Sequence, residues 1–202
     1  MMEDEFYMPP GFMDIPPQLF DSETNGPIRF CKICGKDLIE SHSDYLIQKS
    51  FRRFPKQRLD EVLFEFAICS ECNRQMHNEL SEESKKMMEK YMEEEIHHAD
   101  PMERMMKLSS EEKADFRDLT GHCAVTGKSL DELEEYTIIA QGKGSRLVLG
   151  MLPLTVSYEA QEGLNELLSQ KTRDFLDGFT KEHFSGPPGI EELLGPRRPM
   201  FV

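Results

Sequence analysis

Two Cys-x-x-Cys pairs constrain the fold of this 202-residue chain more than any other feature of its sequence. The first pair lies in Phe-Cys-Lys-Ile-Cys-Gly-Lys and the second in Ile-Cys-Ser-Glu-Cys-Asn. Four thiolates brought together can occupy the corners of a tetrahedron, the arrangement that structural zinc prefers. We therefore predict one structural zinc ion per chain, bound by a cysteine cluster made of Cys31, Cys34, Cys69 and Cys72. Four protein sulfurs leave no position for water or substrate, so the cluster predicts no catalysis.

The composition excludes several classes of function. The chain carries a net charge of −14, and an acidic surface repels phosphate backbones, so we expect no general affinity for DNA or RNA. No apolar run reaches the roughly 18 residues that a membrane helix needs, so we expect no membrane partner. The acidic start is unlike a signal peptide, and an odd number of cysteines disfavours a disulfide framework. Together these features favour a cytoplasmic protein whose cysteines bind metal.

Composition and motif spacing divide the chain into five segments. The acidic, proline-containing segment 1–29 is expected to be a disordered arm, with the alternative that its aromatic residues dock on the body of the protein or on a partner. Segment 185–202, also rich in proline, is expected to be a flexible tail. Between them we expect a zinc-binding lobe at 30–100, a helical linker at 101–120 and a metal-free lobe at 121–184.

The zinc-binding lobe should consist of a turn, two strands and a helix. A strand is expected near 44–48, and a second strand alternates apolar and polar residues up to Cys69. A long helix is predicted from the second cysteine pair to about His98, because its apolar residues recur at helical spacing. In the linker, the Ser-Ser-Glu-Glu sequence at 109–112 predicts the start of a shorter helix that ends at Gly121.

The pattern of the first lobe recurs in the second. Residues 123–130 (Cys-Ala-Val-Thr-Gly-Lys-Ser-Leu) align with residues 31–38 (Cys-Lys-Ile-Cys-Gly-Lys-Asp-Leu), and matching strand and helix residues follow in the same order. We interpret this as an internal duplication, which predicts an α+β protein with two tandem lobes. The ligand positions of the second copy hold Cys123, Thr126, Ser157 and Ala160. The second lobe should therefore bind no zinc, and its cysteine should be a buried, inert thiol.

The order of these motifs resembles a known zinc fold. A Cys-x-x-Cys-Gly-Lys turn, a hairpin and an Ile-Cys-x-x-Cys sequence that opens a helix resemble the treble clef, and the motif is similar to that of the zinc-binding domain of the ClpX unfoldase. The resemblance covers residues 30 to about 85, and no full-length family is recognised. It implies two treble-clef-like lobes, the second without metal, in a protein that binds partners and performs no chemistry.

The second cysteine pair also resembles part of the zinc frame of HNH nucleases. Those enzymes need a histidine base on the first strand, and the strand expected from Asp44 has none; His42 precedes it and His77 follows in the helix. We therefore expect no catalytic residues and no enzyme activity. A degenerate nuclease of this type is the activity that comes nearest.

A basic segment at residues 49–58 interrupts the acidic chain, and we predict that it is a loop between the two strands of the first lobe. Its candidate partner-binding residues are Phe51, Arg52, Arg53, Phe54, Lys56 and Arg58. Cations interleaved with aromatic rings can bind single-stranded nucleic acid. The acidity of the chain favours the alternatives, in which these cations face its own carboxylates or an acidic protein partner.

Two patterns in the predicted long helix leave more than one interpretation open. His97 and His98, with Glu93 as the i, i+4 neighbour of His97, suggest a second metal site, but histidines also favour helix C-termini in general. A series of methionines suggests an adaptable binding surface or packing between the lobes. Its members are Met87, Met88, Met92, Met102, Met105 and Met106.

Taken together, the sequence favours a non-enzymatic zinc-binding protein that acts by binding another protein. The alternative is a nucleic-acid-associated protein derived from an HNH or zinc-ribbon ancestor, which would bind through residues 49–58.

Overall fold

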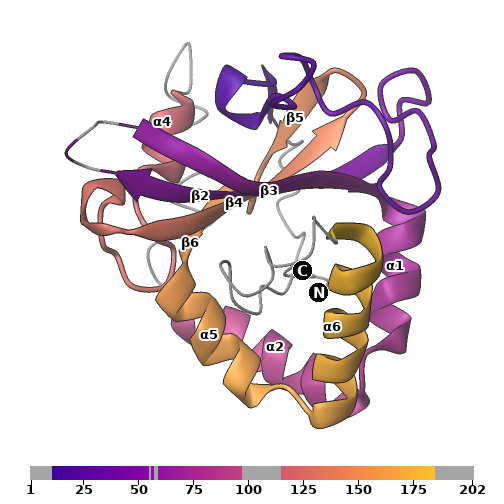
Figure 1. Cartoon of the computed structure of the whole chain (residues 1–202), viewed down its shortest axis with the longest axis vertical. Helices are drawn as coiled ribbons and strands as arrows, with labels where there is room; N and C mark the ends of the chain where they lie inside the picture. Colours follow the sequence, from indigo (N-terminus) through magenta and orange to yellow (C-terminus); the bar gives the residue numbers. More distant parts are fainter. Residues whose placement is uncertain (1–10, 55, 57–58, 97–114, 185–202) are drawn as a thin grey trace, which may run out of the picture.

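The computed structural model describes residues 11–54, 56, 59–96 and 115–184, which form an α+β fold around one antiparallel sheet. The strands are β1 (Gly11–Asp14), β2 (Asp44–Phe54), β3 (Leu59–Cys69), β4 (Glu135–Lys143), β5 (Arg146–Leu149) and β6 (Leu154–Ser157). Their order is β1-β5-β4-β2-β3, and β6 pairs with β4 beside this path (Figure 1). The predicted α+β class is confirmed.

The helices cover mainly one face of this sheet. On that face lie α1 (Ser70–Glu79), α2 (Glu82–Glu95), α5 (Tyr158–Leu167) and α6 (Gln170–Phe184) (Figure 1). The opposite face carries the N-terminal segment, with the 3-10 turn η1 (Pro17–Leu19), and the short helix α4 (Phe116–Thr120). A second 3-10 turn, η2 (Leu130–Glu132), precedes β4. Within the described ranges, no helix is long and apolar enough to cross a bilayer.

The first half (residues 11–96) and the second half (residues 115–184) share this sheet. Strand β2 pairs with β4 from Asp44, opposite Lys143, to Arg52, opposite Glu135. Each half adds its own antiparallel partner, β3 to β2 and β6 to β4. The two predicted lobes are therefore joined along their central strands.

The same hydrogen bonds occur at corresponding positions of the two halves. The amide of Cys31 donates to the Lys36 carbonyl (2.9 Å), and the amide of Cys123 donates to the Lys128 carbonyl (2.8 Å). The glycines in these turns have φ angles of +70° at Gly35 and +69° at Gly127, a backbone conformation that glycine adopts without steric cost. Both turns thus reverse the chain in the same way.

The predicted long helix is in fact two helices. Leu80 has an extended backbone (φ −66°, ψ 148°) and a buried side chain, and it separates α1 from α2. Ser81 then caps α2, because its hydroxyl accepts a hydrogen bond from the Ser84 amide at 3.1 Å. The cap and the burial of Leu80 together favour the break over a continuous helix. The predicted end near His98 lies outside the described residues.

The break between α1 and α2 lies next to a similar break in the second half, where Leu168 has an extended backbone between α5 and α6. The hydroxyl oxygens of Ser81 and Ser169 lie 2.8 Å apart. The Ser81 amide donates to the Thr172 hydroxyl at 3.0 Å, and the Ser169 amide donates to the Ser84 hydroxyl at 2.9 Å. We call Ser81, Ser84, Ser169 and Thr172 the hydroxyl junction. It fastens the start of α2 to the start of α6.

The prediction of a disordered arm is wrong for residues 11–29. Strand β1 pairs with β5, and Leu19 is completely buried, as are Ile15 and Ile28 to a slightly lesser degree. Burial of these apolar side chains offsets the conformational entropy that the segment loses when it becomes ordered. Neighbouring prolines reduce that loss, because they already restrict the backbone of the unfolded chain. Residues 11–29 instead dock on the body of the protein, which is the alternative stated above. Residues 1–10 lie outside the described residues.

The predicted loop at 49–58 is mostly strand. Strand β2 continues from Asp44 to Phe54, and β3 begins at Leu59. The basic residues of β2 stand opposite acidic ones on its neighbours: Lys49 is opposite Glu65 on β3, and Arg52 is opposite Glu135 on β4. Opposite charges on facing strands stabilise the pairing, which explains why a charged sequence continues as strand. In the linker, the helix that ends before Gly121 begins only at Phe116, because Asp115 has an extended backbone and caps α4. Residues 109–112, the predicted start, lie outside the described residues.

Candidate metal centre

The cysteine cluster is assembled from a turn, a strand end and a helix start. Cys31 and Cys34 lie in the first turn, whose Gly35 amide donates to the Cys31 carbonyl at 2.9 Å. Cys69 ends β3, and Cys72 lies in the first turn of α1. The Lys32 amide donates to the Ala67 carbonyl at 2.8 Å, which holds the turn against the end of β3. Local backbone geometry thus brings the two pairs together.

The sulfur positions fit a tetrahedral zinc site. All sulfur atoms of the cluster lie within 4.8 Å of one another, and those of Cys34 and Cys69 are 3.8 Å apart. A Zn–S bond of about 2.3 Å implies an edge of about 3.8 Å between sulfurs in a tetrahedron. Among the described residues, this is the group with the ligand number and spacing of a metal site. The cluster can therefore hold a metal ion, and its all-sulfur donor set favours zinc.

Three of the four thiols are buried and the fourth is accessible. Cys31, Cys69 and Cys72 are at most 4% exposed, whereas Cys34 is exposed. Burial raises the pKa of Cys72 and Cys69 above the usual thiol value. For Cys31 burial acts in the same direction, but amide hydrogen bonds from Cys34, Cys69 and Ile33 outweigh it and lower its pKa to about 7. A bound cation favours the thiolate form, so metal binding should release protons from the buried thiols.

The corresponding position in the second half holds one sulfur. Cys123 is completely buried, and its sulfur accepts hydrogen bonds from the amides of Thr126 (3.4 Å) and Ser157 (3.3 Å). Burial tends to raise the pKa of Cys123, but hydrogen bonds from Ser157 and Thr126 lower it overall. The Ser157 hydroxyl also accepts from the Ala160 amide at 3.3 Å and caps α5. At the positions where the first half has three further thiols, the second half thus has hydroxyl and amide contacts around the single sulfur.

The candidate partner-binding residues of the basic segment are largely occupied within the chain. Phe51 is buried and stacks on Tyr136 with ring centroids 5.1 Å apart. Arg52 pairs with Glu135 at 2.8 Å, and Arg53 pairs with Asp131 and, at 3.7 Å, with Asp60.

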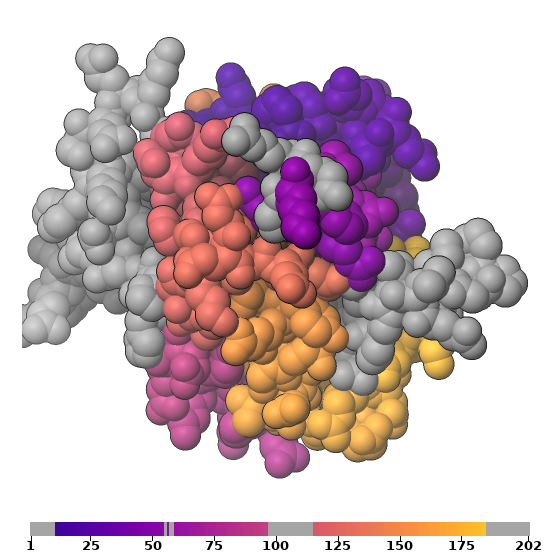
Figure 2. All heavy atoms as spheres, turned by 60° about the vertical axis from the view of Figure 1, so that its left-hand side comes forward, coloured from indigo at the N-terminus to yellow at the C-terminus, as the bar shows by residue number. Residues whose placement is uncertain are grey.

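Figure 2 shows this end of β2 beside the surface of the second half. Phe54 is half-buried and Lys56 is exposed, whereas Arg58 lies outside the described residues. These contacts correspond to the alternative in which the cations face the chain's own carboxylates.

The remaining candidates of the long helix are only partly described. Met87, Met88 and Met92 are half-buried on α2, and Met88 packs against the core. The other methionines of the series lie outside the described residues, as do the histidines proposed for a second metal site. Glu93, their predicted co-ligand, is exposed on α2.

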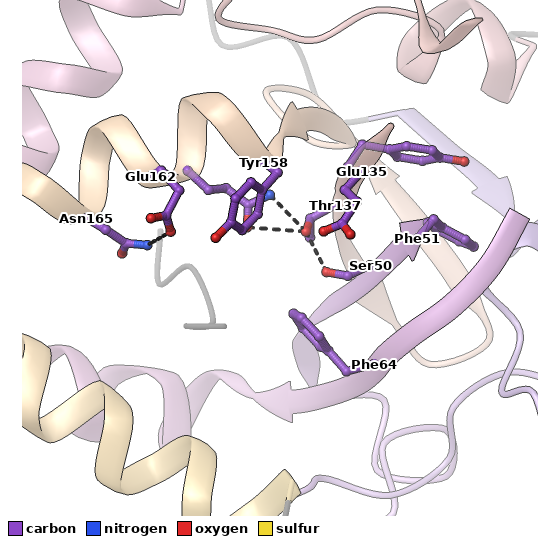
Figure 3. A pocket seen from close by; sticks show the side chains of 10 residues that line it. Ser50, Phe51, Phe64, Glu135, Thr137, Tyr158, Glu162 and Asn165 are labelled. Carbon is purple, nitrogen blue, oxygen red and sulfur yellow. Dashed lines mark hydrogen bonds between the residues drawn. The ribbon is translucent and has the colours of Figure 1, made fainter. Parts of the chain in front are cut away.

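A pocket that the sequence did not predict lies between the sheet and α5 (Figure 3). Ser50 and Thr137 line it from β2 and β4, and Tyr158 and Glu162 line it from α5. Ser50 and Phe51 both line it although they are neighbours in β2, because the pairing of β2 with β3 is irregular between them.

Comparison of the chain with protein-family models, curated proteins and solved structures found no match. Its function is therefore inferred from the geometry of its own residues.

Proposed function

We propose that this protein is a non-enzymatic, zinc-stabilised module that binds another protein. The observation that carries the proposal is the cysteine cluster, whose sulfur atoms all lie within 4.8 Å of one another at the junction of a turn, a strand and a helix. Protein sulfur fills every tetrahedral position of such a site, so the zinc would be structural, one ion per chain. Reduced thiols suit a reducing compartment, which we propose to be the cytoplasm.

The architecture that we propose is two tandem treble-clef-like lobes derived by internal duplication. Supporting this, Tyr45 pairs with Cys69 in the first half and Tyr136 pairs with Ser157 at the aligned position of the second. The first helix after each of these strands has 10 residues, Ser70–Glu79 and Tyr158–Leu167. In this proposal zinc stabilises one lobe, while packing and hydroxyl contacts stabilise the other. Surfaces, rather than the metal, would carry the function.

The ion pairs of the basic segment weigh against the nucleic-acid alternative. Its arginines at 52 and 53 are paired with carboxylates of the chain, and a phosphate backbone would have to displace these partners. We therefore propose a protein as the partner.

Metal analysis and affinity capture test the proposal in two steps. Purified protein should contain one zinc per chain, and Cys69→Ser should lose it together with the fold of the first half. Tagged wild-type protein should then capture a specific protein from its own cells, and the Cys69→Ser variant should not. Substoichiometric zinc in the wild type would contradict the metal assignment, and specific capture of nucleic acid in place of protein would contradict the partner class.

A further inference from the structure

The pocket against α5 has a buried polar floor. The hydroxyl oxygens of Ser50 and Thr137 lie 2.5 Å apart, and the Gln161 amide donates to Thr137 Oγ1 at 3.0 Å (Figure 3). Both hydroxyl residues are at most 3% exposed. Mutual hydrogen bonds fix these side chains, and their oxygens are available as acceptors on the floor of the pocket.

The walls of the pocket combine aromatic rings with negative charge. Tyr158, which is 37% exposed, lines one wall, and Phe64 lines another (Figure 3). Two carboxylates, Glu135 and Glu162, also line the pocket. Glu135 is neutralised by Arg52 at 2.8 Å. The Glu162 carboxylate accepts a hydrogen bond from Asn165 at 3.2 Å and makes no ion pair within the described part of the chain, so it supplies the uncompensated charge.

The size of the pocket restricts what can enter it. Its volume of about 10 Å³ is that of a single water-sized group. A nucleotide or a planar cofactor is far too large, and an anion would be repelled by Glu162. The ammonium group of lysine is compact, cationic and carries three N–H donors. It matches the hydroxyl acceptors and the carboxylate, and the side chains of Tyr158 and Phe64 lie beside it.

We propose that this pocket binds a lysine ammonium group from a basic peptide segment of the partner. The inference rests on the proposed role in protein binding and adds a surface and a chemical class of partner. A chain with a net charge of −14 attracts basic segments from a distance. The aligned positions of the first half hold Leu46 in place of Thr137 and Arg74 in place of Glu162, which removes the acceptor and reverses the charge. The site therefore belongs to the metal-free half.

Fluorescence anisotropy with the zinc-loaded, full-length protein tests this inference. The probe is a fluorescein-labelled peptide with lysines spaced by glycine and serine, at low ionic strength. Wild-type protein should bind it, and Glu162→Gln should weaken binding by about tenfold, the effect of losing a hydrogen bond to a charged group. The matched control is Glu166→Gln, which removes the same charge from an exposed position of α5 outside the pocket. Acetylation of the peptide lysines should abolish binding.

Each opposite outcome overturns a specific part of the inference. Equal losses for Glu162→Gln and Glu166→Gln would indicate general electrostatic attraction rather than a pocket. Equal or tighter binding of a matched arginine peptide would exclude selection of ammonium. No binding by wild-type protein that retains zinc and captures its partner would overturn the pocket while leaving the proposed function intact. Zinc content and circular dichroism of each variant separate these outcomes from misfolding.

Discussion

The two halves of this protein build the same turn with different means of holding it together. In the first half, four thiols converge within 4.8 Å and can share a metal ion. In the second half, a single buried sulfur accepts backbone amides, and Ser157 caps the following helix. Cys69, at the position of Ser157, makes no such cap. The comparison teaches that the same backbone turn can be built around four thiols or around one buried sulfur with hydroxyl and amide contacts.

Zinc removal should have the largest effect, and it should affect the first half far more directly than the second. A strong chelator, or Cys69→Ser, should remove about 10 kcal/mol of metal-binding free energy and unfold the first half, because its turn and helix start are anchored on the cluster. Thermal unfolding and zinc content measure the effect. Cys123→Ser is the control and should retain one zinc per chain. A metal-free first half with native thermal stability would show that zinc is dispensable in both halves.

Installing the missing ligands should make the halves equivalent. The triple change Thr126→Cys, Ser157→Cys and Ala160→Cys completes a cluster around Cys123, whose sulfur already lies 3.5 Å from the Ser157 hydroxyl oxygen. We expect the zinc content to rise from one to two ions per chain, as measured by plasma mass spectrometry. The double change without Ala160→Cys supplies three sulfurs and should bind the second ion more weakly. Unchanged stoichiometry in a folded triple variant would show that the second turn has lost the ligand geometry.

A buried ion pair distinguishes the first half from the second. Lys49 and Glu65 lie 2.6 Å apart with side chains 5% and 15% exposed, whereas Ala140 occupies the position aligned with Lys49. Glu65→Gln should destabilise the protein by about 3 kcal/mol in chemical denaturation, because it leaves a buried ammonium group without its counterion. Glu82→Gln, which breaks an exposed pair with Lys85, should cost under about 1 kcal/mol. Equal costs for the two variants would contradict this reasoning.

The smallest expected effect is that of the hydroxyl cap in the second half. Ser157→Ala removes the acceptor of the Ala160 amide and should lower the free energy of unfolding by about 1 kcal/mol. Denaturant unfolding measures this change, with Ser145→Ala in an exposed turn as a neutral control. A neutral Ser157→Ala would mean that apolar packing alone holds the metal-free turn.

Features set by local chemistry could be predicted from the sequence. The spacing of the cysteine pairs predicted a cluster, and the structure brings these sulfurs within metal-binding distance. The alignment of residues 31–38 with 123–130 marked two turns that have the same hydrogen bonds. Both depend on residue identity and short spacing, which a sequence displays directly.

Features set by distant contacts could not be predicted in this way. Leu19 is buried only because a sheet built from residues far along the chain lies beside it. The length of β2 depends on carboxylates of β3 and β4 that face its cations. The break at Leu80 did have a local signal, because Ser81 followed by two glutamates is typical of a helix start, but the apolar stripe that crosses it favoured one long helix. The pocket combines residues of three strands and a helix, so no single stretch of sequence reveals it.

The hydroxyl junction and the shared central strands make the halves cooperative. Ser81 and Ser169 bond to each other where α2 and α6 begin, and β2 pairs with β4 along its length. Loss of structure in the first half would expose groups of the second, so it should lower the stability of the second half as well. By thermodynamic linkage, an ion bound only by the first half raises the stability of the second half as well. In the zinc-bound protein that we propose, loss of the ion from the first half should therefore also destabilise the surface of the second half.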